Sequence, residues 1–245
     1  MIIPPEDFVI CSIRLFFVSV SLLISIRIMS KYFQANDKLF LYAGLAWVGM
    51  FESWMPSTVG FIAAFFLPNS LPLEVLVIIG NWFLPIGLFM WILLFTKLVI
   101  EKHKKIIVYC TAAFGVIFET VFFILLFTDS KSVYKQGPPP EYVSTPFNIY
   151  YALLFQIFQL VFLIIFIITG ILFARKSMQS SNDEVKLKGK LLLAAFLLYL
   201  IGALIAILES SALIILISSF FLTSSSIAFY GGYILPNWMK KILRK

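Results

Sequence analysis

Histidine, cysteine and charged residues are scarce in this chain of 245 residues. It has one histidine, His103, and two cysteines, Cys11 and Cys110, and only 13% of its residues are charged. Because His103 stands among lysines in a polar stretch, we expect neither a histidine-based metal site nor a serine–histidine hydrolase. The sequence also contains no glycine-rich phosphate loop. It therefore predicts a protein that is not an enzyme and that uses no metal or other cofactor.

The signatures of two familiar seven-helix classes are missing as well. The last apolar stretch contains no lysine, which excludes the retinal Schiff base of a rhodopsin. Asp-Arg-Tyr after the third apolar stretch and Asn-Pro-x-x-Tyr in the seventh, both signatures of G-protein-coupled receptors, are absent too. The sequence therefore favours neither class.

Apolar residues, by contrast, dominate the chain. Hydrophobic residues make up 61% of it and the mean hydropathy is +1.01, whereas soluble domains are about 45–50% apolar. Lipid must be the solvent of such a chain, which predicts a multi-pass protein of the cell membrane. We expect an all-α fold in which residues 1–245 form a single seven-helix transmembrane domain. The predicted spans are 8–28, 39–66, 72–97, 105–128, 146–174, 190–208 and 211–235.

Positive charge follows one set of connections between these spans. Sixteen of the 19 lysines and arginines lie near the connections between spans one and two, three and four, and five and six, or after span seven. The exceptions are Arg14, Lys131 and Lys135. Positive connections stay in the cytoplasm, so we expect the N-terminus outside and the C-terminus inside. The net charge of +7 then reflects topology and contact with anionic lipid, and we expect no nucleic-acid partner.

Three ionisable residues fall inside the predicted spans: Arg14, Glu52 and Glu119. Charges at this depth are costly, which makes them candidates for a functional site. At 1.5 Å per residue, Arg14 lies about 9 Å, Glu119 about 13 Å and Glu52 about 20 Å below the outer ends of their spans. Arg14 could therefore pair with Glu119 or with Glu52. Such a pair is either a structural ion pair or part of a ligand- or proton-sensing cluster open to the outside.

Two prolines stand four residues after polar side chains inside neighbouring spans. Pro56 follows Glu52, and Pro85 follows Asn81. Proline cannot donate to the carbonyl four residues back, so we expect helix kinks that leave the Glu52 and Asn81 carbonyls free. Asn81 thereby joins Arg14, Glu52 and Glu119 as a candidate site residue. The pattern indicates either a polar cavity or a kinked bundle whose polar groups satisfy one another.

Small hydroxyl residues mark the last span and the turn before it. Ser218 and Ser225 share one helical face, and serine at this spacing usually mediates close packing between membrane helices. Ser210 or Ser211 is placed to cap the N-terminus of this helix. We therefore predict that the last span packs closely against a neighbour, and contact with a second copy of the chain stays open.

Two short motifs resemble a class of membrane sensors. One is Glu184-Val-Lys-Leu-Lys-Gly-Lys190, and the other is Tyr230-Gly-Gly-Tyr-Ile-Leu-Pro236-Asn-Trp238-Met-Lys-Lys. The second resembles the close of the seven-helix sensor regions of prokaryotic histidine kinases, and the first resembles archaeal membrane proteins of that kind, including stand-alone ones. The resemblance implies a sensor but supplies no ligand residues. Because we expect no kinase or other output domain after Lys245, sensing would require a partner protein.

Three functions fit these observations. The leading hypothesis is a receptor-like sensor of an unknown ligand or of protons, which signals through a cytoplasmic or membrane partner. The second is a small solute or ion transporter or channel that uses Glu52 as its coupling carboxylate. The third is a structural subunit whose buried charges only hold the bundle together. The lipid bilayer is the expected partner in every case, and the sequence leaves the oligomeric state open.

Overall fold

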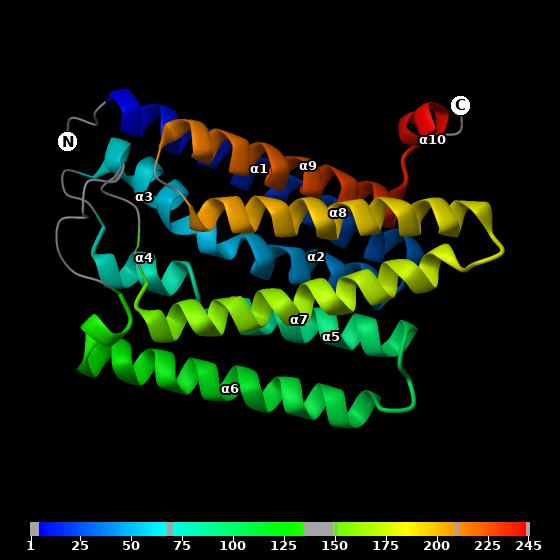
Figure 1. Ribbon diagram of the computed structural model, residues 1–245, viewed down its shortest axis with the longest axis horizontal. Coiled ribbons are helices and arrows are strands. Elements are labelled where there is room, and N and C mark those ends of the chain that lie inside the picture. Colours follow the sequence, from blue (N-terminus) through cyan, green and yellow to red (C-terminus); the bar gives the residue numbers. More distant parts are fainter. Residues whose placement is uncertain (1–4, 68–70, 135–148, 150, 209–210, 244–245) are drawn as a thin grey trace.

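The computed structural model describes residues 5–67, 71–134, 149, 151–208 and 211–243, and the regular elements of this part of the chain are helices (Figure 1). The fold is all-α, as the sequence predicts. The helices are α1 (Pro5–Ala35), α2 (Lys38–Phe51), the 3-10 helix η1 (Glu52–Trp54), α3 (Met55–Phe66), α4 (Leu73–Ile79), α5 (Leu84–Leu98), α6 (Lys104–Thr128), the 3-10 helix η2 (Ser130–Ser132), α7 (Leu153–Met178), α8 (Asp183–Ile207), α9 (Ala212–Ile234) and α10 (Asn237–Leu243).

Six helical segments in the described ranges are long and apolar enough to cross a membrane. They are α1, the α4–α5 segment Leu73–Leu98, α6, α7, α8 and α9. Exposed large apolar side chains occur along all of them, as expected of surfaces that face lipid. The chain is therefore a multi-pass membrane protein, and the lipid bilayer is its solvent.

The segment predicted as one helix over 39–66 is divided in the structure. α2 has 14 residues and α3 has 12, and the three residues of η1 separate them. A helix needs about 20 residues to cross the hydrocarbon layer, so neither α2 nor α3 can cross it alone. Six segments of the described part of the chain thus have the length and composition of the seven predicted spans, and one of these six, Leu73–Leu98, is itself divided between α4 and α5.

Capping residues explain several helix boundaries. α1 continues past its predicted end at residue 28 to Ala35, where Asn36 takes a positive φ of 50°. Asp37 then caps α2 by accepting a hydrogen bond from the Leu39 N–H at 3.0 Å. Ser211 caps α9 through the Ile214 N–H, which confirms one of the two predicted caps. The first residues of the predicted span 146–174 lie outside the described residues, and α7 begins at Leu153.

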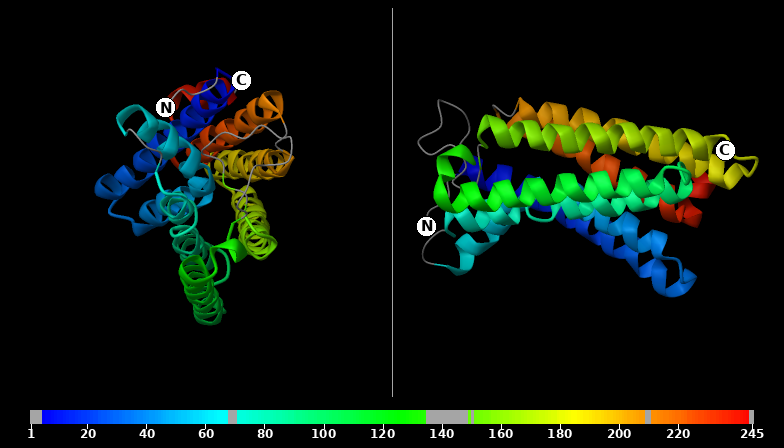
Figure 2. Two further views of the ribbon diagram at one scale, coloured as in Figure 1. Left: turned by 90° about the vertical axis from the view of Figure 1, so that its left-hand side faces the viewer. Right: turned by 90° about the horizontal axis from the view of Figure 1, so that it is seen from below.

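The long helices run side by side, with α6 at the edge of the bundle (Figure 2). α1 packs against α2 and α9, α8 lies between α7 and α9, and α5 packs against α2, α6 and α7. Phenylalanine rings join α6 to α7, with Phe118 in contact with Phe155, Phe158 and Phe162. α6 thus reaches α7 through large side chains, whereas the inner helices approach more closely.

The closest approach between α2 and α5 is made by two glycines. A Cβ atom added to Gly49 would lie 2.6 Å from the Gly87 Cα, so no larger residue fits there without a shift of the backbone. Small residues at such crossings let membrane helices pack by van der Waals contact. Because α2 and α5 run in opposite directions, the crossing places the end of α2 beside the start of α5.

The serines of α9 pack against α8, which confirms the close contact predicted for the last span. The Ser218 hydroxyl donates to the Gly202 carbonyl at 3.1 Å, and the Ser225 hydroxyl donates to the Ala195 carbonyl at 2.8 Å. Gly202 itself packs against Leu222. These bonds satisfy buried hydroxyls inside the bundle, where water is excluded.

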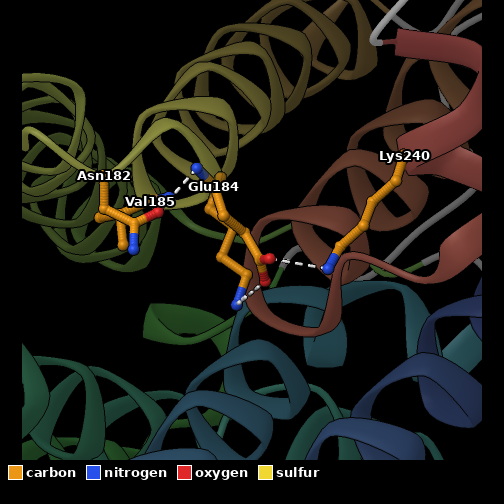
Figure 3. Close-up of polar contacts among 5 residues, drawn as sticks. Asn182, Glu184, Val185 and Lys240 are labelled. Carbon is orange, nitrogen blue, oxygen red and sulfur yellow. Dashed lines mark hydrogen bonds and ion pairs between the residues drawn. The ribbon is translucent and has the colours of Figure 1, made fainter.

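The two sequence motifs, residues 184–190 and 230–241, meet at one end of the bundle. Lys240 of α10 lies 2.7 Å from a Glu184 carboxylate oxygen at the start of α8, and Lys188 lies 3.5 Å from the other oxygen (Figure 3). Asn182 caps α8 immediately before them. We call this end, which carries α10, the C-terminal end, and the opposite one, where α1 begins, the N-terminal end.

Candidate functional site

Glu52 lies at the break between α2 and α3 and is 1% exposed. We predicted that Pro56 would leave the Glu52 carbonyl without a partner, and this is wrong. The backbone tightens into η1, and the Glu52 carbonyl accepts the Met55 N–H instead. A 3-10 turn joins residues three apart, so it does not need the N–H that Pro56 lacks.

A second break divides α4 from α5. α4 ends at Ile79, the chain bends through residues 80–83, and α5 begins at Leu84. Pro85 is the second residue of α5, as Pro56 is the second residue of α3. Proline is tolerated in the first turn of a helix because the N–H that it lacks has no intrahelical acceptor there. Both prolines thus stand at the start of a new helix, where a kink within a continuous one was expected.

The Gly49–Gly87 contact brings the two breaks together. Glu52 follows Gly49 by three residues, and Phe83 precedes Gly87 by four on the opposing segment. One carboxylate oxygen of Glu52 accepts the Phe83 N–H at 2.7 Å. No side chain from its own segment caps α5, so Glu52 supplies an acceptor to this helix start from another helix. A negative charge there is also favoured by the helix dipole.

The other oxygen of Glu52, Oε2, has no hydrogen-bond partner among the residues that the structure describes. The Oε1 atom of Glu119 on α6 is also buried, and it too has no hydrogen-bond partner among these residues. Gly115, one turn before Glu119, packs against Pro85 at the start of α5. Glu119 therefore approaches the second break from the α6 side.

Asn81 is fully buried within the second break and is held by three hydrogen bonds. Its amide donates to the Val77 carbonyl at 2.9 Å and to the Tyr151 hydroxyl at 2.8 Å. Its carbonyl oxygen accepts from the Gln159 amide at 3.0 Å. The bent segment between α4 and α5 is thereby tied to α7 and to the residues just before it. Such a satisfied polar network fixes one arrangement of the break.

A cavity of about 540 Å³ adjoins this network at the N-terminal end of the bundle. Ligand pockets are commonly about 300–1,000 Å³ and mostly apolar, with a few convergent polar groups. Most of the lining side chains are apolar here too, and most of these apolar side chains come from α7 and α8. The polar lining residues are Arg14, Ser53, Ser57, Tyr151, Gln156, Gln159 and Tyr199.

The four predicted site residues divide between the network and the cavity. Glu52, Asn81 and Glu119 surround the breaks, whereas Arg14, which is 5% exposed, lines the cavity. Tyr151 and Gln159 connect the two, because both line the cavity and both bond to Asn81. The pairing of Arg14 with Glu52 or with Glu119 stays a prediction.

Sequence reasoning missed two tyrosines of this site. Tyr151 lies just before α7, and Tyr199 lies on α8, where its hydroxyl donates to the Met50 carbonyl at 2.7 Å. Neither stands in a motif or beside a proline, so no signal in the sequence sets them apart from the other tyrosines. Gln159 carries a clearer signal, because an amide within an apolar span is itself conspicuous.

Charged and hydrogen-bonding groups of several kinds meet at this site. Among the described residues no three histidine, cysteine, aspartate or glutamate side chains lie together as metal ligands would. The site combines two carboxylates, a guanidinium, amides and hydroxyls around an apolar cavity. No protein-family model matches the chain, and no curated protein matches it either. The argument for its function therefore depends on this geometry alone.

Proposed function

We propose that the protein is a seven-helix membrane sensor whose ligand enters the cavity at the N-terminal end. Residues 1–245 would form a single transmembrane module, with this end outside the cell and the C-terminal end in the cytoplasm. The observation that carries the proposal is the 540 Å³ cavity, which shares Tyr151 and Gln159 with the polar network at the helix breaks. Occupancy of the cavity could thereby alter the packing of α4 and α5.

Support for a seventh crossing comes from the path of α2, η1 and α3. Figure 1 shows them following one another from the C-terminal end of the bundle to the N-terminal end. α2 packs against α1 and α5, α3 packs against α1 and α4, and Glu52 at the break between them is 1% exposed. Broken helices are tolerated within a membrane where protein covers the freed backbone groups. The positive connections all lie at the C-terminal end under this arrangement.

The proposed output is the basic C-terminal end. The Glu184–Lys240 ion pair joins the start of α8 to α10, and these segments carry the two motifs that resemble kinase sensor regions. α8 also lines the cavity near its other end, at Ala203 and Ala206. A displacement of α8 would therefore reach the surface that we expect to contact a signalling partner.

Thermal unfolding of the purified protein against pH and a panel of metabolites tests this proposal. A ligand at a hundredfold excess over its Kd stabilises the folded state by about 2.7 kcal/mol, so a binder raises the unfolding temperature. We expect Glu52→Gln or Glu119→Gln to abolish this response, and Glu101→Gln, at an exposed position, to preserve it. If no condition shifts the transition and both variants are merely less stable, the sensor proposal fails and a structural subunit is favoured.

A transporter is the second candidate, because two neighbouring segments are broken beside a buried carboxylate with one unpartnered oxygen among the described residues. Discontinuous helices near the centre of the membrane form the substrate and ion sites of many transporters. In this case Glu52 would be the coupling carboxylate. Flux into proteoliposomes that disappears in Glu52→Gln would establish transport. Ligand binding by the reconstituted protein without any flux, in vesicles shown not to leak, would favour the sensor.

A further inference from the structure

The cavity has its mouth on the side of the bundle that faces lipid. Leu153, Ile157 and Leu160 of α7 all line the cavity, and at spacings of four and three residues they share one helical face. Their exposed fractions are 69%, 51% and 44%. Ile207, at the end of α8, also lines the cavity and is 70% exposed. Side chains that border both the cavity and the outer surface place an opening between α7 and α8.

The packing of α7 against α8 explains why the opening is at this end. Toward the C-terminal end the two helices are in close contact, since a Cβ atom added to Gly170 would lie 2.5 Å from the Phe196 ring. Gly189 packs in the same way against Ala174 and Met178. Figure 1 shows α7 and α8 separating as they run from their connection toward the N-terminal end. The cavity fills this separation, so an apolar chain could enter sideways from the bilayer.

The cavity is also lined by polar residues, one of which carries a buried positive charge. Arg14 lines it beside Ser53, Ser57 and Tyr151. A guanidinium has five N–H donors and stays charged, so it can bind a carboxylate or phosphate while it also contacts protein groups. The Tyr151 hydroxyl accepts from Asn81 and keeps its own hydrogen for donation. A charge-assisted hydrogen bond is strong in such a site, because little water competes for it.

We propose that the cavity binds an amphipathic anion, with its acidic head at Arg14 and its hydrocarbon chain between α7 and α8. This inference rests on the proposed sensor function and names the ligand class of the same site. The apolar lining residues favour the hydrocarbon chain, and Arg14 selects the charge of the head. Entry from the outer half of the bilayer would make the protein a sensor of acidic lipid-like molecules.

Quenching of Trp54 by bromine-labelled amphipaths tests the inference, because Trp54 lines the cavity. The protein is placed in nanodiscs and titrated with bromododecanoate, bromododecanol and bromododecyl-trimethylammonium. The part of the fluorescence quenching that is lost in Trp54→Phe is the signal from the cavity. Trp82 and Trp238 are both exposed and report the background quenching by probe dissolved in the lipid. We expect saturable Trp54 quenching by the carboxylate at about a tenfold lower concentration than by the other two.

Two pairs of variants locate the binding site. Arg14→Gln should weaken the binding of bromododecanoate by about tenfold and leave the binding of bromododecanol unchanged. Arg27→Gln, at an exposed position of α1, should change the binding of neither probe. If Arg14→Gln does not fold, Ala203→Phe fills the cavity without removing a charge and should abolish Trp54 quenching. Leu204→Phe, on the exposed face of α8, is its matched control.

Equal quenching of Trp54 by all three probes would overturn the proposal that the ligand is an anion, and would leave the sensor proposal standing. If no probe quenches Trp54 in a way that Ala203→Phe abolishes, entry from lipid is overturned as well. The sensor proposal is decided separately by the pH and metabolite panel, because those ligands need not come from the bilayer.

Discussion

Glu52 acts on a helix other than its own. Its carboxylate accepts the Phe83 N–H at the start of α5, where the backbone N–H groups have no intrahelical acceptor. In water such groups bond to solvent, but inside the bundle a protein acceptor is required. Glu52, which the sequence alone marks as an energetically costly buried charge, therefore also has a structural role.

Removal of this acceptor should destabilise the protein. We expect Glu52→Ala to lower the free energy of unfolding in detergent by about 1–3 kcal/mol, because the Phe83 N–H loses its partner. Glu52→Gln keeps an acceptor oxygen and should cost less. Glu101→Ala, at an exposed position, controls for loss of a carboxylate. Equal losses in Glu52→Ala and Glu52→Gln would show that the capping bond contributes nothing.

The sequence identifies the costly residues of the site but not their partners. Arg14, Glu52, Asn81 and Glu119 are conspicuous because polar groups are rare in apolar spans. Which of them meet depends on how the helices are rotated and crossed. The hydrogen bonds of Asn81 to residues 70 and 78 positions away could not be read from helical spacing.

At the level of elements, the crossing of α2 and α5 determines the geometry of the site. The contact of Gly49 with Gly87 sets the register between the two breaks, and the Glu52–Phe83 bond follows from that register. The sequence predicts a disturbance at Pro56 and Pro85 but not its form. Whether a helix kinks or restarts depends on what satisfies the freed backbone groups, and that is a matter of tertiary packing.

A methyl group at this crossing should push the helices apart. We expect Gly49→Ala to lower the free energy of unfolding by about 1–3 kcal/mol, because the new Cβ would stand 2.6 Å from backbone that cannot rotate away. Gly115→Ala is the matched control, since its Cβ would lie 3.2 Å from the Pro85 side chain on the peripheral helix α6. A Gly49→Ala protein as stable as the parent in thermal unfolding would contradict the tight crossing.

At the level of the whole molecule, hydropathy predicts most of the fold and charge predicts its orientation. Six segments of the described chain have the length and composition of spans, at positions close to those expected. The remaining segment, 38–66, is apolar enough to be predicted as a span but is broken in its middle. The order of helices around the bundle, with α6 at the edge, could not be predicted, because the spans are strongly apolar and show no clear polar face.

The number and direction of crossings are tested most directly by thiol labelling in intact cells. In a chain with Cys11 and Cys110 replaced by serine, Phe33→Cys and Leu67→Cys bracket the broken segment at exposed positions. We predict that a membrane-impermeant maleimide labels Leu67→Cys in intact cells but labels Phe33→Cys only after permeabilisation. Labelling of both from the same side would show that residues 38–66 do not cross the membrane, and would contradict the seven-helix sensor.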